Sequence, residues 1–147
     1  MTSLPKEELA RLLPHGRSMC LLDSVEGWDD LTIRCRTSTH RDPANPLRFG
    51  GRLTVAAGLE YAAQAMGAHV GLVGGLQQGA YRVGLVGGVR EVVFSADRLD
   101  DLEGPLLVAA RRLVEGERGY MYEFTVAHGG VKLIEGRASI FLKVTGP

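Results

Sequence analysis

The stretch Leu53–Val73 reads LTVAAGLEYAAQAMGAHVGLV and is the strongest secondary-structure signal in the chain. Its apolar residues recur every three or four positions, the spacing of one α-helical face, and they are Val55, Leu59, Ala62, Met66, Val70 and Val73. Thr54 suits the helix start, because its hydroxyl can accept a backbone N–H. The glycines at 71, 74 and 75 favour its end. At about 1.5 Å per residue, such a helix spans roughly 30 Å and crosses a small domain.

The opposite face of this helix carries no Lys or Arg, although a helix on a protein surface usually does. Its residues are small or uncharged apart from one, and they are Ala57, Glu60, Gln64, Gly67, Ala68 and Gly71. A glycine inside a helix costs about 1 kcal/mol relative to Ala, so glycines at 58, 67 and 71 indicate close backbone contact. We therefore expect a helix that is buried nearly all round, by a sheet and by a partner. A buried carboxylate is costly unless it is paired, which makes Glu60 the first candidate for chemistry.

The composition of the chain narrows its class. Its 147 residues suggest one domain, and its 17 basic and 17 acidic residues give no net charge and no basic run that would indicate nucleic-acid binding. The N-terminus lacks the apolar core of a signal peptide, and Glu60, Gln64 and His69 make the long helix a poor membrane span. Cys20 and Cys35 form no ligand or redox motif, so reduced structural thiols are expected. No nucleotide-binding motif is present. We expect a cytoplasmic protein.

The order of the other elements predicts the sheet. A short helix is expected over 5–13, and strands over 19–25, 31–39, 82–94, 106–115, 120–128 and 131–144. The strand 82–94 is expected to bulge at Gly87 and Gly88. A run of strands after one helix favours an antiparallel α+β sheet over βαβ units. One long helix on a curved antiparallel sheet is the hot-dog fold, here as a single domain over residues 1–147.

Two stretches resemble the hot-dog 3-hydroxyacyl-[acyl-carrier-protein] dehydratases. Residues 12–25, LLPHGRSMCLLDSV, are similar to the family's N-terminal LPHR-x-P-x-LL-x-D-x-V segment. Residues 58–65, GLEYAAQA, are similar to its central helix, with the Glu-x-x-x-Gln pair at Glu60 and Gln64. The resemblance is greatest to the divergent dehydratases of aryl-polyene and related clusters. Strand order and length agree over nearly the whole chain.

The resemblance implies a reaction and roles for several residues. A 3-hydroxyacyl thioester on an acyl carrier protein would lose its α-proton to a His, while a carboxylic acid helps the hydroxyl to leave as water. By this register Glu60 is the acid and Gln64 the residue that orients it from the next turn. Backbone N–H groups near Val55 and Ala56 would bind the thioester oxygen. No dissociable cofactor is implied.

The loop before the helix departs from the family pattern. The main branch places a His in an H-F-P-G-R-P loop fourteen positions before its acidic residue, which is Pro46 here, and the loop NPLRFGGRLT contains no His. His15, in the N-terminal motif, becomes the provisional base, with a turn histidine as the alternative. An imidazole suits proton abstraction near neutral pH. His40 is expected to be solvated, His69 to be a satisfied core histidine, and His128 to lie exposed in a hairpin.

Other conspicuous residues have simpler interpretations. Asp23 is expected to fix the local backbone. The arginines that could meet a phosphopantetheine phosphate are more simply surface residues, and they are Arg17, Arg48 and Arg52. Tyr61 and Trp28 are expected to pack, and the scattered His and Cys residues offer no metal-ligand spacing.

The sequence therefore predicts a dehydratase of acyl-carrier-protein thioesters that forms a homodimer or pairs with a second hot-dog protein. Two alternatives stay open. One is a thioesterase on the same fold, in which Glu60 would activate water. The other is a non-catalytic acyl-binding or partner subunit, which the missing loop histidine favours. Chain length and the identity of the carrier stay open.

Overall fold

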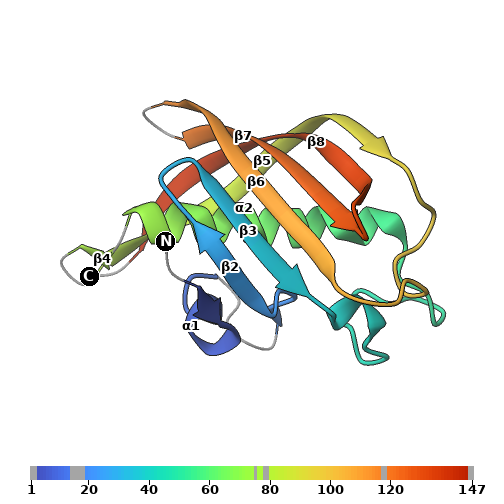
Figure 1. Cartoon of the computed structure of the whole chain (residues 1–147). Helices are drawn as coiled ribbons and strands as arrows, with labels where there is room; N and C mark the ends of the chain where they lie inside the picture. The colour runs from blue at the N-terminus through green and yellow to red at the C-terminus, as the bar shows by residue number, and fades with distance from the viewer. Residues whose placement is uncertain (1–2, 14–18, 75, 78–79, 117–118, 146–147) are drawn as a thin grey trace.

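The computed structural model describes residues 3–13, 19–74, 76–77, 80–116 and 119–145, and a curved sheet wraps around one long helix (Figure 1). The described sheet is 8-stranded and antiparallel, in the order β1-β2-β3-β6-β7-β8-β5-β4. The strands are β1 Leu4–Pro5, β2 Ser24–Trp28, β3 Thr32–Thr37, β4 Leu76–Gln77, β5 Ala80–Phe94, β6 Leu106–Glu115, β7 Gly119–His128 and β8 Val131–Thr145. The helices are α1 Lys6–Ala10 and α2 Gly58–Gly74, and the 3-10 turns are η2 Thr39–Arg41 and η3 Val55–Ala57. This is the predicted hot-dog arrangement.

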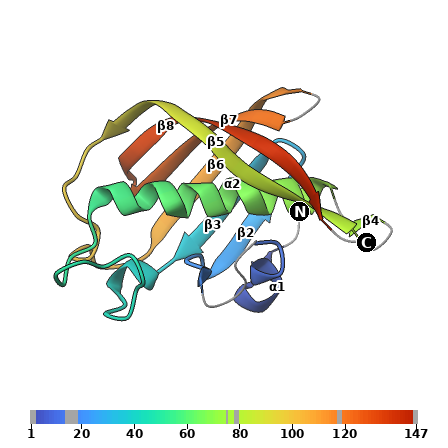
Figure 2. The same cartoon turned by 180° about the vertical axis from the view of Figure 1, so that it is seen from behind.

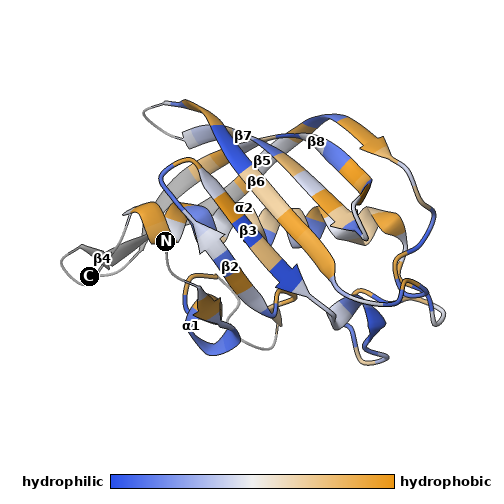
Figure 3. Cartoon of the chain, viewed as in Figure 1, coloured by the Kyte–Doolittle hydropathy of each residue, from blue (hydrophilic) through white to orange (hydrophobic). Residues whose placement is uncertain are grey.

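The inner face of the sheet packs on α2, as the view from behind shows (Figure 2). Alternation along the strands produces this layer, because successive side chains point to opposite faces. In β7 the buried residues are Tyr120, Tyr122, Phe124 and Val126, as the sequence pattern predicts. Bands of hydrophobic and hydrophilic residues alternate along β3 in the same way (Figure 3).

The start of the helix differs from the prediction. Residues 53–55 pair with the segment 97–99 instead of beginning the helix: Leu99 N donates to Leu53 O at 2.8 Å, and Val55 N donates to Asp97 O at 3.0 Å. Thr54 has extended backbone dihedrals at the N-cap position, and its side chain makes no capping hydrogen bond. The predicted Thr54 cap is therefore wrong, because a long-range pairing holds this segment.

α2 is buried along most of its length, as predicted. Two of its glycines allow the close contacts that their position indicated: a Cβ at Gly58 would overlap Ile134 Cδ1, and a Cβ at Gly71 would lie 3.1 Å from Leu12 Cδ2. Glu60 is the exposed residue of α2, and the half-buried ones are Leu59, Ala63, Leu72, Val73 and Gly74. Glu60 and Ala63 are three residues apart, so they share one face of the helix.

Two predicted boundaries near the N-terminus are corrected. The apolar run 19–25 is not a strand along its length, because β2 begins only at Ser24 and the preceding residues run beside α2. The first helix is shorter than predicted and occupies Lys6–Ala10. The long strands agree well with the prediction, and β5 contains the expected irregularity between Val86 and Gly88.

The strand β5 leaves much of one edge free among the described residues. It pairs with β8 on one side, while β4 meets it only at Ala80 and Tyr81 on the other. Val86 and Val89 lie opposite the buried Ile140 and Ala138, so they belong to the inner face, yet both are exposed. An apolar strand with an unpaired edge is a template for pairing with another chain.

Candidate functional site

Glu60 lies in the first turn of α2 and is the one charged residue of that helix at neutral pH. Its side chain is exposed, and it makes no hydrogen bond or ion pair with any residue that the structure describes. The desolvation expected from the sequence is therefore not provided by this chain alone. The carboxyl group is free to meet a ligand or a partner surface.

Gln64 lies one turn after Glu60 and holds a different part of the chain. Its Oε1 accepts a hydrogen bond from Leu21 N at 2.8 Å, and its Nε2 donates to Met19 O at 2.7 Å. Both ends of the amide are thus committed to the backbone of residues 19–21. The predicted role of Gln64 in orienting Glu60 is replaced by this clamp on the segment that follows the N-terminal motif.

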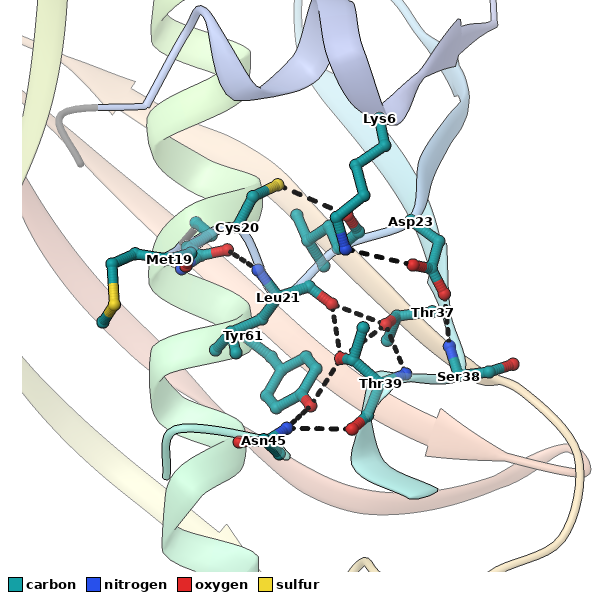
Figure 4. A network of polar contacts seen from close by, with 12 residues as sticks. Lys6, Met19, Cys20, Leu21, Asp23, Thr37, Ser38, Thr39, Asn45 and Tyr61 are labelled. Carbon is teal, nitrogen blue, oxygen red and sulfur yellow. Dashed lines mark hydrogen bonds and ion pairs between the residues drawn. The ribbon is translucent and has the colours of Figure 1, made fainter. Parts of the chain in front are cut away.

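A buried polar network continues from this clamp to Tyr61, the residue that follows Glu60 in the sequence (Figure 4). Tyr61 Oη lies 2.8 Å from Thr39 Oγ1 and accepts a hydrogen bond from Asn45 Nδ2 at 2.9 Å. Thr39 Oγ1 donates in turn to Leu21 O at 2.6 Å. Tyr61 was expected only to pack, and the sequence pattern did not predict this network. The available signal was a hydroxyl on a helix that was expected to be buried nearly all round, where a polar group needs a hydrogen-bond partner.

Two backbone N–H groups at the start of the helix, those of Val55 and Ala56, were expected to bind the thioester oxygen. Only one of them lacks a hydrogen-bond partner among the described residues. Val55 N–H is committed to Asp97 O, so the prediction that it binds a thioester oxygen is wrong. Ala56 is exposed and its N–H has no partner among the described residues. Asp100 holds the segment 53–55 in place, because its Oδ1 accepts a hydrogen bond from Leu53 N at 2.8 Å. Arg98 bonds to the same carboxylate and holds the pKa of Asp100 well below its usual range.

His15 lies outside the described residues, as does Arg17. Their chain neighbours on both sides are described and contact α2. Leu12 packs against Gly71, and Met19 O accepts from Gln64.

His40 is fully buried, so the expectation of a solvated histidine is wrong. Its Nε2 donates to Leu102 O at 2.9 Å, and its Nδ1 is buried without a partner among the described residues. Burial lowers the pKa of His40 below its ordinary value. The polar residues around His40 in the sequence suggested an exposed loop. In the structure His40 lies in η2 and contacts the segment after Leu99 through Leu102 O, and this long-range contact is not visible in the local sequence.

His69 is the satisfied core histidine that the sequence predicts. Nε2 donates to Asp29 O at 2.8 Å, and Nδ1 accepts from Tyr122 Oη at 2.6 Å. Arg112 donates to the same hydroxyl at 3.0 Å, and its guanidinium lies 3.6 Å from the centre of the Tyr120 ring. Burial lowers the pKa of His69 and raises the pKa of Tyr122 to about 12. Both groups are held neutral.

The remaining candidates are structural. His128 lies half-exposed at the end of β7 with Nε2 on Glu103 O. Asp23 accepts from Ser38 N at 2.7 Å and from Lys6, which is the backbone-fixing role expected of it. Arg48 donates to Gly51 O and His40 O, and these bonds hold the loop in which it lies. Arg52 is exposed.

Cys20 and Cys35 are free and buried, and burial raises the pKa of Cys35 to about 12. Trp28 packs against the core, with its Nε1 buried and unpartnered among the described residues.

Within the described ranges, no three His, Cys, Asp or Glu side chains gather as a metal site. No described helix has the length and apolar character needed to span a membrane.

Comparison with known families identifies the chain. A family model described as ApeP-like, ApeP dehydratase, matches residues 7–144, nearly the whole sequence. The chain belongs to the ApeP-like dehydratase family. The resemblance found at the N-terminal motif and the central helix is thereby confirmed, and the protein is a dehydratase, a lyase of the hot-dog fold. No curated protein matches this chain.

Solved structures agree on the fold. The dehydratase heterocomplex ApeI:P from Xenorhabdus doucetiae contains a chain with a TM-score of 0.76 and 22% identity, and the match covers 92% of this chain and 90% of that one. A mutant thioesterase from Pseudomonas aeruginosa matches with a TM-score of 0.68 and 17% identity over 95% and 94% of the two chains. A thioesterase from Haemophilus influenzae matches at 0.66 and 14%, over 97% and 92%. At these identities the likeness shows the hot-dog fold alone.

Proposed function

We propose that this ApeP-like dehydratase removes water from 3-hydroxyacyl thioesters on an acyl carrier protein and releases trans-2-enoyl thioesters. The observation that carries the proposal is the state of Glu60. It is an accessible carboxyl group without a described partner, on a helix with no other charge. Structural carboxylates in this chain, such as Asp23 and Asp100, are bonded instead.

In the proposed reaction, a base takes the proton from the α-carbon and the electron pair of that bond forms the new C=C bond. The C–O bond at the β-carbon breaks, and the carboxyl group of Glu60 gives its proton to the leaving hydroxyl, which departs as water. Charge that develops on the thioester oxygen is stabilised by a backbone donor at the helix start. Ala56 N–H is the donor that this proposal uses.

His15 is the base in this proposal. Support comes from the other histidines: both ring nitrogens of His69 are bonded, and His40 and His128 each direct Nε2 to a backbone carbonyl. Support also comes from Gln64, because its clamp on Met19 ties the chain just after the N-terminal motif to the helix turn that follows Glu60.

The proposed assembly is a dimer with a second hot-dog protomer, either a copy of this chain or a related protein. The free edge of β5 and the exposed valines beside it support pairing through that strand. A protomer seated there would also exclude water from α2, and so supply the desolvation that a carboxylic acid needs to remain a proton donor. The assembly should bury at least the roughly 1,200–2,000 Å² of a stable interface. A cytoplasmic location stays a prediction from the sequence.

The test is incubation of the purified protein with a 3-hydroxyacyl carrier thioester, with enoyl thioester absorbance and free thiol followed in parallel. Enoyl product without thiol release is the expected result. Thiol release instead would identify a thioesterase. Neither signal, with tight binding of the acyl carrier, would favour a non-catalytic partner subunit.

A further inference from the structure

Residues 19–21 lie before β2, and hydrogen bonds hold their backbone to α2, β3 and η2. Gln64 Oε1 accepts from Leu21 N at 2.8 Å, and Gln64 Nε2 donates to Met19 O at 2.7 Å. Leu21 O accepts two more hydrogen bonds, each of 2.6 Å, from threonine hydroxyls of β3 and η2. Because the backbone is held at so many points, the fold sets the position from which each side chain of this segment starts.

Met19 is the exception among the side chains of this segment, because it is 41% exposed while Cys20 and Leu21 are buried. Figure 4 shows the Met19 side chain directed away from the polar network beside it. A methionine side chain is unbranched and flexible, and it adapts its shape to irregular apolar partners. The segment therefore presents one adaptable apolar group at the surface of α2, where Gln64 binds the Met19 backbone.

Three accessible groups follow one another along this part of the protein. Ala56, in η3, is exposed and has a backbone N–H without a partner among the described residues. Glu60, in the first turn of α2, has an accessible carboxyl group. Met19 comes next, because its backbone is bound to Gln64, about 6 Å beyond Glu60 along the helix axis. The order is thus a hydrogen-bond donor, an acid and an apolar side chain.

A 3-hydroxyacyl thioester carries complementary groups in the same order. Its carbonyl oxygen accepts hydrogen bonds, its β-hydroxyl leaves with a proton from an acid, and the carbon chain beyond the β-carbon is apolar. With the oxygen at Ala56 and the hydroxyl at Glu60, the chain continues along α2 toward Met19. The accessible face of the helix ends there, since Gly67 and Gly71, the next residues on that face, are buried.

We propose that Met19 contacts the acyl chain beyond the β-carbon and determines which chain lengths bind. This inference rests on the proposed function, because Ala56 and Glu60 place the thioester and the hydroxyl. It adds a specificity-determining residue that the reaction itself does not require. A smaller side chain at this position admits longer chains, and a larger one excludes them.

The experiment measures how affinity depends on chain length, by NMR titration with saturated straight-chain acyl thioesters of N-acetylcysteamine that have four, six, eight and ten carbons. These probes carry no hydroxyl, so they bind without being dehydrated. Met19→Trp should weaken binding of the longest probe relative to the shortest at least about tenfold, the discrimination that one methylene gives in an apolar site. Met19→Ala should shift the preference toward longer probes. Met19→Leu nearly conserves volume and should leave the preference unchanged.

The matched control is Leu107→Trp. Leu107 is 44% exposed, and its neighbours Leu106 and Val108 are buried, so its side chain lies on the outer face of β6, away from α2. Leu107→Trp should leave the dependence on chain length unchanged. Melting temperature and sedimentation velocity are measured on every variant, and the exposed position of Met19 means that its variants should fold.

An unchanged dependence on chain length in folded Met19→Trp and Met19→Ala would overturn the proposal, as would the failure of every probe to bind. A changed assembly mass in Met19→Trp, without a changed dependence on chain length, would assign Met19 to a contact between protomers and overturn it too. Dehydration of a 3-hydroxyacyl carrier thioester is measured separately. Met19-dependent binding without dehydration would leave the chain contact standing and remove the proposed function.

Discussion

Glu60 and His69 lie on the same helix, about 14 Å apart along its axis, and their surroundings are opposite. His69 is fully buried and both of its ring nitrogens are bonded, to Tyr122 Oη and to Asp29 O. Glu60 is exposed and has no partner among the described residues. Toward the C-terminal end of α2, the polar side chain has hydrogen bonds at both of its nitrogens. At the N-terminal end, the carboxyl group has no hydrogen-bond partner among the described residues.

The comparison separates two uses of a polar residue on an apolar helix. A buried polar group stabilises a fold only when every donor and acceptor is paired, and the His69 network meets that condition at both nitrogens. A catalytic group must instead keep its reactive atoms available to the substrate. On this criterion His69 is structural, and Glu60 is the residue that we propose for the chemistry.

The largest effect is expected from His15→Ala, which should lower dehydration by about 10²-fold or more if His15 is the base. The matched control is His128→Ala, which removes a half-exposed histidine at the far end of β7 and should leave turnover near its original value. Steady-state rates on both folded variants make the measurement. Full activity in His15→Ala, with loss of activity in a folded His40→Ala protein, would transfer the role of base to His40.

Tyr122→Phe should lower the free energy of unfolding by about 1–3 kcal/mol. Removing the hydroxyl leaves His69 Nδ1 and an N–H of Arg112 buried without their shared partner. Urea unfolding measures the loss, and the rate per folded molecule should not change. A Tyr122→Phe protein of full stability, or one that is folded and inactive, would contradict the assignment of this end of α2 to structure.

Acid should weaken the fold by a smaller amount. Burial lowers the pKa values of His69 and His40 below the ordinary 6.5. Just below pH 6.5 the two histidines therefore bind more protons in the unfolded chain than in the folded chain, and this favours unfolding. Their contribution to stability is complete above pH 6.5 and is lost as the pH falls through the folded pKa values. Urea unfolding between pH 7.5 and 5 should show the decline, and His69→Gln should make it shallower. An identical decline in that variant would show that His69 is not responsible.

Local pattern was sufficient for the long strands, but not for contacts between distant segments. The alternation of Tyr120, Tyr122 and Phe124 identified the inner face of β7. The absence of other charges on the helix singled out Glu60 as a candidate acid, and that role stays a prediction. The helix start was misplaced because residues 53–55 pair with 97–99, more than forty residues away in sequence. The burial of His40 and the clamp formed by Gln64 depend on similar long-range contacts, which no periodicity records.

The central claim, that Glu60 supplies chemistry and not stability, is tested most directly by Glu60→Gln. The substitution keeps size and hydrogen bonding but removes the transferable proton. Melting temperature and dehydration rate are measured on the same preparation, with the carrier thioester as substrate. The account predicts a loss of turnover of about 10²-fold or more with a melting temperature equal to or above that of the original protein. A folded Glu60→Gln protein with full activity, or one that loses activity only through unfolding, would contradict it.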